Sequence, residues 1–489
     1  MSEAVKDVGC AKRHWFFGHI RKLTPNEAGM RRMVKWMKKF PKVTLNWFGP
    51  FTFVLSTYHP DIIKPVLGSD TPKDNVSYRF MRPWIGDGLL TSYGDKWKRN
   101  RRLLTPAFHF DILKRYLVCF NDSVAELIKK WSTSSENCVS VELFTDISAM
   151  TLDNLLQCIL SKKSGCQSGK SMEYLNAIKC ITEGVVGRLR NPLYHFDLIF
   201  YLSPAGKKFK EACKTVHSFS SAAINERKSS LKHGNERDST DDTTKLDFLD
   251  IMLLAKDDNG IGMSHQEICD EVDTFVFEGH DTVSSGICWI IYNLATNPEH
   301  QEICRNEVFE VLGEQQRVKY ENLFKFKYLT MCIKESMRLH PPVPSVGRKM
   351  NKPFFFSNGF GPDQYNTNSS ESSGPESSKI IHTNTLIGVS IYRLHRNPCI
   401  WSNPEVFDPE RFTPENRSKR SSHAYVPFSA GSRNCIGQNF AMNEMKVTLA
   451  LALQRFRFSL DETYPKPAVQ PQLVLRSTTG IHVKLEKLE

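Results

Sequence analysis

The chain has 489 residues, of which 40% are hydrophobic and 24% are charged, an ordinary globular composition that argues against a disordered, fibrous or membrane-spanning protein. Sixty-five Lys and Arg against 53 Asp and Glu give a net charge of +12, which reflects either a merely basic surface or an acidic partner, anionic membrane or anionic substrate. Because these charges are spread along the chain, no nucleic-acid-binding arm is expected.

Thirteen cysteines are scattered along the sequence without a Cys-x-x-Cys pair or a regular spacing. Because the number is odd, at least one thiol lacks a disulfide partner, and a reducing compartment is expected. The longest uncharged apolar runs, such as 287–291 and 447–453, are much shorter than the roughly 20 residues that span a bilayer. The sequence therefore predicts no membrane-spanning helix and no secretory leader.

The first part of the chain is predicted to be mainly helical around one short hairpin. Basic and aromatic residues up to about Phe40 indicate an amphipathic helix, lying either on a lipid surface or in solvent. Aromatic and β-branched residues at 43–55, with a Gly-Pro pair among them, indicate the hairpin. Helical patterns then continue to about Glu310, interrupted by a polar segment at 229–245 that we expect to be a surface loop.

The clearest predicted helix starts at a capping box formed by Ser264 and Glu267 and continues to Asn297, where Pro298 ends it. Its roughly 32 residues would span about 48 Å, which is typical of a central strut. Asn297 and Pro298 also fit the cap and first residue of the following helix.

Later segments contain one more helix, a low-complexity stretch and strands. A helix is expected at about 328–340. Residues 357–379 are rich in Ser, Asn, Gly and Pro and are predicted to be a disordered surface insertion. Short apolar alternations after Pro471 predict a C-terminal hairpin.

One cysteine stands in an unusual context. Gly431 and Gly437 bracket Cys435 in a segment that leads into a helical pattern. Glycines allow close backbone approach to a bound group, and the free amides at a helix start stabilise a thiolate, which is a ligand for iron. The alternative is a buried and chemically inert cysteine.

The run from Phe428 to Gly437 resembles the heme-binding signature of the cytochromes P450, with Phe428, Gly431, Arg433, Cys435 and Gly437 at its defined positions. The resemblance implies a mainly α fold with small β-sheets, and residues 1–489 as a single heme-thiolate catalytic domain. It also implies that Cys435 is the axial ligand of heme iron and that Arg433 pairs with a heme propionate.

Other motifs of the same family are present. Glu335 and Arg338 resemble its ExxR motif, whose spacing places both side chains on one helical face, and Arg411 in Pro-Glu-Arg-Phe would complete a buried structural network. By itself, a Glu–Arg pair at this spacing is a common surface feature. Trp97 and Arg101 resemble a WxxxR motif that faces a propionate, and Arg348 stands where the family often places another propionate-binding arginine.

The predicted long helix contains a segment, 277–283, that resembles the oxygen-activating motif of the family. Gly279 and Thr282 are expected to weaken the regular helical hydrogen bonding and open a local groove. The resemblance implies that Asp281 and Thr282 deliver protons to the bound oxygen. Without the cysteine motif, an ordinary amphipathic helix would explain this segment equally well.

Glu278 stands where most cytochromes P450 have a small residue, and 271–282 and 84–114 resemble the fourth family, in which this glutamate is often esterified to a heme methyl group. A covalent tether suits oxidation of a terminal methyl group. The resemblance therefore implies ω-hydroxylation of a fatty acid or related lipid with O2, using electrons from NADPH through cytochrome P450 reductase. The substrate-facing residues that it implies are Leu90, Phe108, Glu278, Thr282 and Val346.

Two departures from the family pattern bear on this interpretation. The segment that normally follows a membrane anchor begins at Arg13, so we expect no anchor, and attachment to the cytosolic face of the endoplasmic reticulum would be peripheral, through the start of the chain or the apolar stretch 193–202. The insertion at 357–379 precedes Ile380–Thr383, where the family has an Ile-Pro-x-Gly turn bordering the substrate channel. Two alternatives therefore remain: a broad monooxygenase of foreign compounds, and a heme protein with impaired turnover.

Overall fold

The computed structural model describes residues 8–50, 52–160, 165–170, 172–234, 247–356 and 379–488. The chain forms two compact units, each assembled from separate stretches of sequence. Unit 1 comprises Met1–Asn75, Met331–Cys435 and Pro467–Thr479, and unit 2 comprises Val76–Thr330, Ile436–Lys466 and Gly480–Glu489. The expectation of one catalytic domain stays a prediction, whereas the mainly α fold with small sheets is confirmed.

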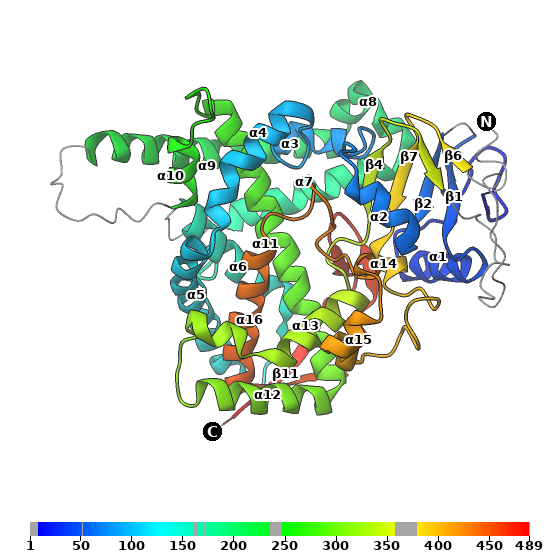
Figure 1. The fold of residues 1–489 in the computed structure, drawn as a ribbon. Coiled ribbons are helices and arrows are strands. Elements are labelled where there is room, and N and C mark those ends of the chain that lie inside the picture. The colour runs from blue at the N-terminus through cyan, green and yellow to red at the C-terminus, as the bar shows by residue number, and fades with distance from the viewer. Residues whose placement is uncertain are drawn as a thin grey trace. The chain divides into compact units, whose positions relative to one another are not determined.

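Unit 2 is mostly helical (Figure 1). Its small sheet has the strand order β3 (Val141–Glu142), β11 (His482–Lys487) and β8 (Phe456–Leu460), all antiparallel. Its short 3-10 turns are η2 (Tyr78–Phe80), η3 (Thr105–Phe108), η4 (Pro192–His195) and η5 (Tyr320–Phe324). Its helices are α3 (Arg82–Ile85), α4 (Gly94–Leu104), α5 (Phe110–Glu136), α6 (Leu143–Leu160), α7 (Met172–Arg190), α8 (Asp197–Leu202), α9 (Pro204–Gly234), α10 (Phe248–Leu254), α11 (His265–Thr296), α12 (Pro298–Leu312) and α16 (Gln438–Arg455).

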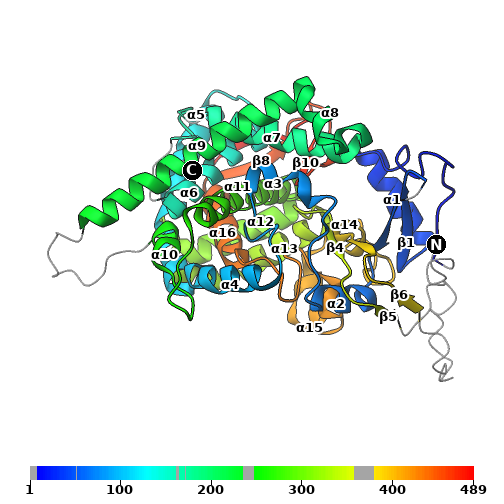
Figure 2. The same ribbon diagram turned by 90° about the horizontal axis from the view of Figure 1, so that it is seen from above.

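Helix α11 is the central element of unit 2, as its length predicted. It has 32 residues, and the capping box of Ser264 and Glu267 is present at its start. Helices α6 and α16 lie alongside it in both views (Figures 1 and 2), and most of its side chains are buried. Residues on α11 are therefore held in fixed positions by packing from several sides.

A buried carboxyl group lies between α16 and α6. Glu444 is fully buried, and its Oε1 accepts a hydrogen bond of 2.8 Å from Asn154 Nδ2. Burial raises the pKa of Glu444 to about 8, because a charge is costly in an apolar interior. At neutral pH this side chain is therefore mostly an uncharged acid that joins two core helices.

Unit 1 contains a four-stranded sheet in the order β1 (Val43–Phe48), β2 (Thr52–Thr57), β7 (Leu386–Val389) and β4 (Val346–Lys349), in which β2 and β7 are parallel. The predicted hairpin is β1 and β2, paired from Val43 with Thr57 to Phe48 with Thr52. The remaining elements are α1 (Glu27–Lys39), α2 (Pro60–Gly68), most of α13 (Lys327–Leu339), β5 (Phe354–Phe356), β6 (Lys379–Ile381), α14 (Ile391–Leu394), η8 (Pro409–Phe412), α15 (Pro414–Ser418), η9 (Ser422–Ala424), β9 (Val469–Pro471) and β10 (Leu475–Ser477).

The structure corrects three expectations about local structure. Helix α9 extends to Gly234, so the beginning of the polar segment 229–245 is helical, and 235–245 lies outside the described residues. After Pro471 the chain does not form one hairpin: β10 pairs with the preceding β9, and β11 joins β8 and β3. Strands β5 and β6 pair with each other, so Lys379, the last residue of the predicted disordered insertion, belongs to a strand instead.

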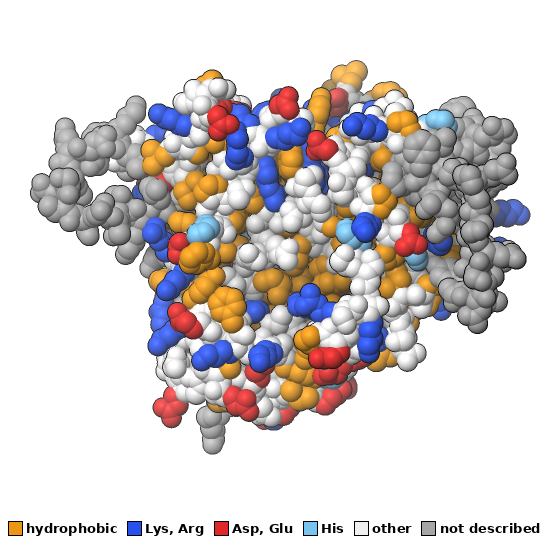
Figure 3. Space-filling model, viewed as in Figure 1, with side chains coloured by type: hydrophobic (Ala, Val, Ile, Leu, Met, Phe, Trp, Pro, Cys, Tyr) orange, Lys and Arg blue, Asp and Glu red, His pale blue; other side chains and the backbone are white. Residues whose placement is uncertain are grey.

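The predicted insertion, apart from Lys379 in β6, lies outside the described residues. In the described part of the chain, no helix combines the length and apolar character needed to cross a membrane. On the face drawn in Figure 3, Lys and Arg side chains lie among Asp and Glu side chains rather than in one separate patch.

Candidate functional site

Residues 426–437, here called the cysteine loop, are held in part by hydrogen bonds within their own backbone. The Cys435 N–H donates to the carbonyl of Phe428 at 2.9 Å, and the Asn434 N–H donates to the carbonyl of Gly431 at 3.1 Å. Gly431 has φ +74°, and a Cβ there would overlap the carbonyl oxygen of Leu67 at the end of α2. Only glycine combines this backbone conformation with such close contact, so Gly431 fixes the loop against α2.

The start of the loop is attached to a buried histidine. The backbone N–H of Val426 donates to His395 Nε2 at 3.0 Å, and the rings of His395 and Tyr425 stack with centroids 5.0 Å apart. Burial, followed by the positive charges of Arg338 and Arg396, lowers the pKa of His395 to about 3. The imidazole is therefore neutral at physiological pH, as an acceptor nitrogen requires.

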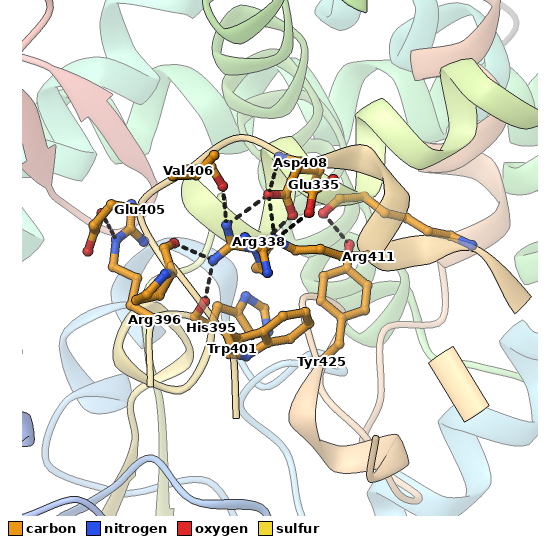
Figure 4. A network of polar contacts seen from close by, with 12 residues as sticks. Glu335, Arg338, His395, Arg396, Trp401, Glu405, Val406, Asp408, Arg411 and Tyr425 are labelled. Carbon is orange, nitrogen blue, oxygen red and sulfur yellow. Dashed lines mark hydrogen bonds and ion pairs between the residues drawn. The ribbon is translucent and has the colours of Figure 1, made fainter. Parts of the chain in front are cut away.

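His395 is itself held by the predicted Glu–Arg pair (Figure 4). Arg338 Nε and Nη2 donate to the two oxygens of Glu335 at 2.7 and 2.8 Å, and neither side chain is exposed. Arg338 also donates to three backbone carbonyls, those of His395 (2.7 Å), Pro404 (2.6 Å) and Val406 (3.0 Å). The pair therefore fixes the irregular backbone between 395 and 406.

The second predicted arginine completes the network. Arg411 Nε lies 3.4 Å from Glu335 Oε1, and Arg411 Nη2 donates to the carbonyl of Asn403 at 3.1 Å. Glu335 Oε1 also accepts the backbone N–H of Asp408 at 2.8 Å. The predicted contact of one glutamate with two arginines is thus present, and Figure 4 shows Trp401 and Tyr425 lying to one side of it.

The other predicted heme-contacting residues lie on separate elements. Trp97 (5% exposed) and Arg101 (half-buried) lie on α4, one helical turn apart. Arg348 on β4 is 1% exposed, and Arg433 in the cysteine loop is 8% exposed. Their contacts with heme remain predictions.

Helix α11 carries the predicted proton-delivering residues. Thr282 Oγ1 donates to the carbonyl of Glu278 at 2.7 Å, the predicted back-bond, but the helix continues through this point without a break. The expected weakening at Gly279 is therefore not seen. A Cβ at Gly279 would lie 2.7 Å from Leu155 Cδ1, so this glycine instead lets α6 pack closely. Asp281 is buried, and Glu278 and Thr282 are half-buried.

The candidate substrate-facing residues occur in both units. Leu90 is half-buried in the segment between α3 and α4, and Val346 is buried in β4. Phe108 belongs to an aromatic cluster, with its ring centroid 5.6 Å from those of both Phe248 and Phe275. Their contact with substrate stays a prediction.

Sequence reasoning missed the carboxyl groups in the first half of α11. Asp270 and Glu271 accept hydrogen bonds from the backbone of the segment before α4. Burial raises the pKa of Glu271 to about 8. The signal available in the sequence was an acidic residue on an apolar helical face, since Ile268 and Phe275 lie one turn to either side of Glu271.

Comparison with known proteins agrees with these motifs. The sequence matches the family described as Cytochrome P450 over residues 8–362 and 375–485, leaving part of the predicted insertion unmatched. The chain belongs to the cytochrome P450 family. Human Cytochrome P450 4F2 is 43% identical over 98% of this chain and 89% of its own, and rabbit Cytochrome P450 4A6 is 43% identical over 99% and 91%. Mouse Leukotriene-B4 omega-hydroxylase 3 is 42% identical over 98% and 88%. These relatives place the chain in the fourth P450 family, confirming the resemblance.

Cytochromes P450 are monooxygenases that use O2, a redox partner and a heme held by a thiolate, and the residues of this P450 fit such a group. All thirteen cysteines lie in the described part of the chain, and three of them, Cys138, Cys399 and Cys435, are exposed. Of these three, only Cys435 directly precedes a long helix, since Gly437 is the N-cap of α16. The accessible sulfur and the loop fixed at Gly431 suit a metal-binding thiolate.

Glu335→Gln tests the network. The substitution removes the negative charge shared by two buried guanidinium groups, and we expect the free energy of unfolding to fall by about 3–5 kcal/mol, the usual effect of breaking a buried ion pair. Urea unfolding followed by circular dichroism measures this loss. The control is Glu27→Gln, which breaks the ion pair with Arg31 on the surface of α1, where Arg31 is 75% exposed. Equal losses in the two variants would contradict the role of burial.

Proposed function

We propose that this P450 hydroxylates the terminal methyl group of a fatty acid or related lipid. The observation that supports oxidation at the terminal carbon is the position of Glu278, the residue proposed to be esterified. It lies one turn before Thr282 on α11, and its carbonyl accepts a hydrogen bond from the Thr282 hydroxyl. The name of the mouse relative, a leukotriene-B4 omega-hydroxylase, supports the same reaction class. One oxygen atom enters the C–H bond and the other leaves as water, which consumes two electrons and two protons in each turnover.

The proposed heme contacts follow the motif residues. In the heme-loaded protein Cys435 would hold the iron, and Arg433, Arg348, Trp97 and Arg101 would hold the propionates. Glu278 would be the residue linked to the macrocycle as an ester, and Phe428 and Gly437 would shape the cysteine loop. When bound, the heme supplies the activation of O2. The supports are the locked cysteine loop and the burial of Trp97, Arg348 and Arg433.

Asp281 and Thr282 are proposed to move protons. The Thr282 hydroxyl donates to the Glu278 carbonyl, and its oxygen keeps lone pairs with which it can accept a proton from a neighbouring donor. Asp281, the residue before Thr282, is buried and therefore shielded from bulk water. A hydroxyl anchored to its own helix has a fixed position for proton transfer.

Electrons are proposed to come from NADPH through cytochrome P450 reductase. The net charge of +12 suits a partner with an acidic docking surface.

A broad monooxygenase of foreign compounds would share all the heme residues. Lipid hydroxylation and oxidation of foreign compounds are therefore distinguished by comparing turnover of lauric or arachidonic acid with turnover of drug-like compounds. A heme protein with impaired turnover would oxidise substrates with added peroxide but not with NADPH and reductase.

We also propose that this P450 contacts a membrane through η4 and α8, at the cytosolic face of the endoplasmic reticulum. Apolar side chains are exposed here, among them Phe196 (65%), Leu198 (75%) and Leu202 (67%). In Figure 3, apolar side chains protrude at the place that α8 occupies in Figure 1. Exposed apolar side chains concentrated on one short segment are typical of an interaction surface.

Leu198→Ser with Leu202→Ser tests this surface. We expect binding to phosphatidylcholine vesicles to fall at least fivefold, since each substitution removes an apolar side chain that would enter the bilayer. Co-sedimentation with vesicles measures the binding. Phe324→Ser is the control because Phe324 is 69% exposed on a different element, η5. An unchanged affinity in the α8 variant would exclude this surface.

Cys435→Ser tests the iron ligand. A serine oxygen is a much weaker donor than a thiolate, so we expect loss of the red-shifted Soret band of the ferrous carbonyl complex. The carbon monoxide difference spectrum of the reduced protein measures it. Cys399→Ser, at another exposed thiol, should leave the band in place. A normal band in the Cys435 variant would show that the ligand is elsewhere.

Glu278→Ala tests the covalent tether. With no carboxyl group at 278 no ester can form, and we expect nearly all the heme to become extractable into acidified organic solvent. Wild-type protein and Glu271→Gln, a change at a second glutamate of α11, should retain their heme through the same extraction. Extractable heme in the wild-type protein would refute the ester.

A further inference from the structure

Residues 86–92, here called the 86–92 loop, connect α3 with α4 and lie against α11 within unit 2. A Cβ at Gly86, where φ is +55°, would overlap Asp270 Oδ1. A Cβ at Gly88 would overlap Thr274 Oγ1 and lie 2.8 Å from the carbonyl oxygen of Asp270. The two glycines therefore allow the backbone of the loop to reach the surface of α11 directly.

Two carboxyl groups of α11 accept the hydrogen bonds of this backbone. The Asp87 N–H donates to Asp270 Oδ2 at 2.9 Å, and the Leu89 N–H donates to Glu271 Oε2 at 2.9 Å. Glu271 is 0% exposed and Leu89 is 7% exposed. A buried N–H group needs an acceptor, and Glu271 provides the one for Leu89.

The same glutamate also holds the helix that follows the loop. Asn100 Nδ2 of α4 donates to Glu271 Oε1 at 3.2 Å, so the two oxygens of one carboxyl group serve the loop and α4. Nearby, Arg99 pairs with Glu267 at 3.3 Å and with Asp257 at 2.7 Å. The loop and α4 are thus attached to the first half of α11 by polar contacts, of which those to Glu271 are buried.

The anchored loop and the proposed chemistry share one stripe of α11. Glu271, Glu278 and Thr282 are separated by seven and four residues, close to whole helical turns, so they lie on one face. The rise along the axis from Glu271 to Glu278 is about 10 Å. Leu90, a candidate substrate-facing residue, directly follows the anchored Leu89.

We propose that Glu271 is a positioning residue that fixes Leu90 relative to Glu278 and Thr282, and thereby sets which carbon of the substrate chain is oxidised. The inference rests on the proposed function, because it concerns the terminal and penultimate carbons of a lipid chain. It adds to that function a residue outside the heme motifs. It also explains why glycines at 86 and 88 face carboxyl and hydroxyl groups of α11.

Two variants disturb the contact from opposite sides. Glu271→Met keeps a similar volume but removes both acceptor oxygens, and Gly88→Ala pushes the loop away from Thr274. In hydrogen-exchange mass spectrometry of the heme-loaded full chain without substrate, we expect the peptide covering 86–92 to exchange at least tenfold faster in both variants. With saturating lauric acid, the ratio of terminal to penultimate hydroxylation should fall at least threefold, while the ferrous carbonyl spectrum is kept.

Matched variants separate positioning from general loss of structure. Glu271→Gln keeps one acceptor oxygen and should recover most of the wild-type exchange and product ratio. Glu444→Met removes another buried carboxyl group, which bonds a side chain of α6, and Gly262→Ala adds a Cβ at an ordinary contact distance of 3.5 Å from the Ala255 carbonyl. Both controls should leave loop exchange and product ratio unchanged.

Each outcome decides the inference. Unchanged loop exchange in Glu271→Met and Gly88→Ala would overturn the anchoring, and faster exchange with an unchanged product ratio would overturn the effect on regiochemistry. An equal fall in the product ratio of the Glu444→Met control would also overturn the effect on regiochemistry. If the wild-type protein does not hydroxylate lauric acid, the proposed function fails, while the exchange data still decide the anchoring and the ratio is measured on whichever substrate is oxidised.

Discussion

Unit 1 depends on one buried negative charge that two arginines share. Glu335 cannot be exposed to water in this fold, so its charge has to be compensated inside, and Arg338 and Arg411 do so. Arg338 then has donors left for the carbonyls of His395, Pro404 and Val406. Because guanidinium donors have a rigid geometry, the compensation of charge also specifies the path of a backbone without regular secondary structure.

This arrangement matters for the thiol because an irregular loop has few hydrogen bonds within its own backbone, here those of Asn434 and Cys435. Ordering its backbone costs about 1–2 kcal/mol for each residue, and that cost has to be offset by contacts elsewhere. The Arg338–His395–Val426 chain of contacts holds the start of the loop, and Gly431 holds its middle against α2. A sulfur ligand prepared in this way needs no large rearrangement when it binds a metal.

Local sequence patterns predicted the structure correctly where contacts between a few neighbouring residues determine it. The capping box at Ser264, the 32-residue helix and the Glu335–Arg338 spacing depend on contacts within one or two helical turns, and the structure has all three. Strand β11 pairs instead with β3, more than 300 residues earlier, and with β8, which lies before Pro471, and a short pattern after Pro471 contains neither. The alternation after Pro471 therefore predicted strands but gave the wrong pairing.

The candidate site shows the same division. The motif residues were found because family resemblance marks them. The contact between Glu335 and Arg411, 76 positions apart, could be predicted only because a second motif contains Arg411. Glu271 belongs to no such pair of motifs: its partners are a backbone amide and Asn100, more than 170 residues away. A backbone amide carries no residue-specific signal, so hydrogen bonds to it are the least visible part of a site in sequence.

The carboxyl groups on one stripe of α11 are coupled through their charges. Burial is the main cause of the raised pKa of Glu271, and the negative charge of Glu278 raises it further. The ester proposed at Glu278 would remove that charge and lower the pKa of Glu271 by this smaller contribution, while burial would still hold it above its ordinary value. An ionised Glu271 accepts stronger hydrogen bonds from Leu89 and Asn100 than a protonated one does. Attachment of the cofactor and anchoring of the 86–92 loop would therefore reinforce each other along a single helix.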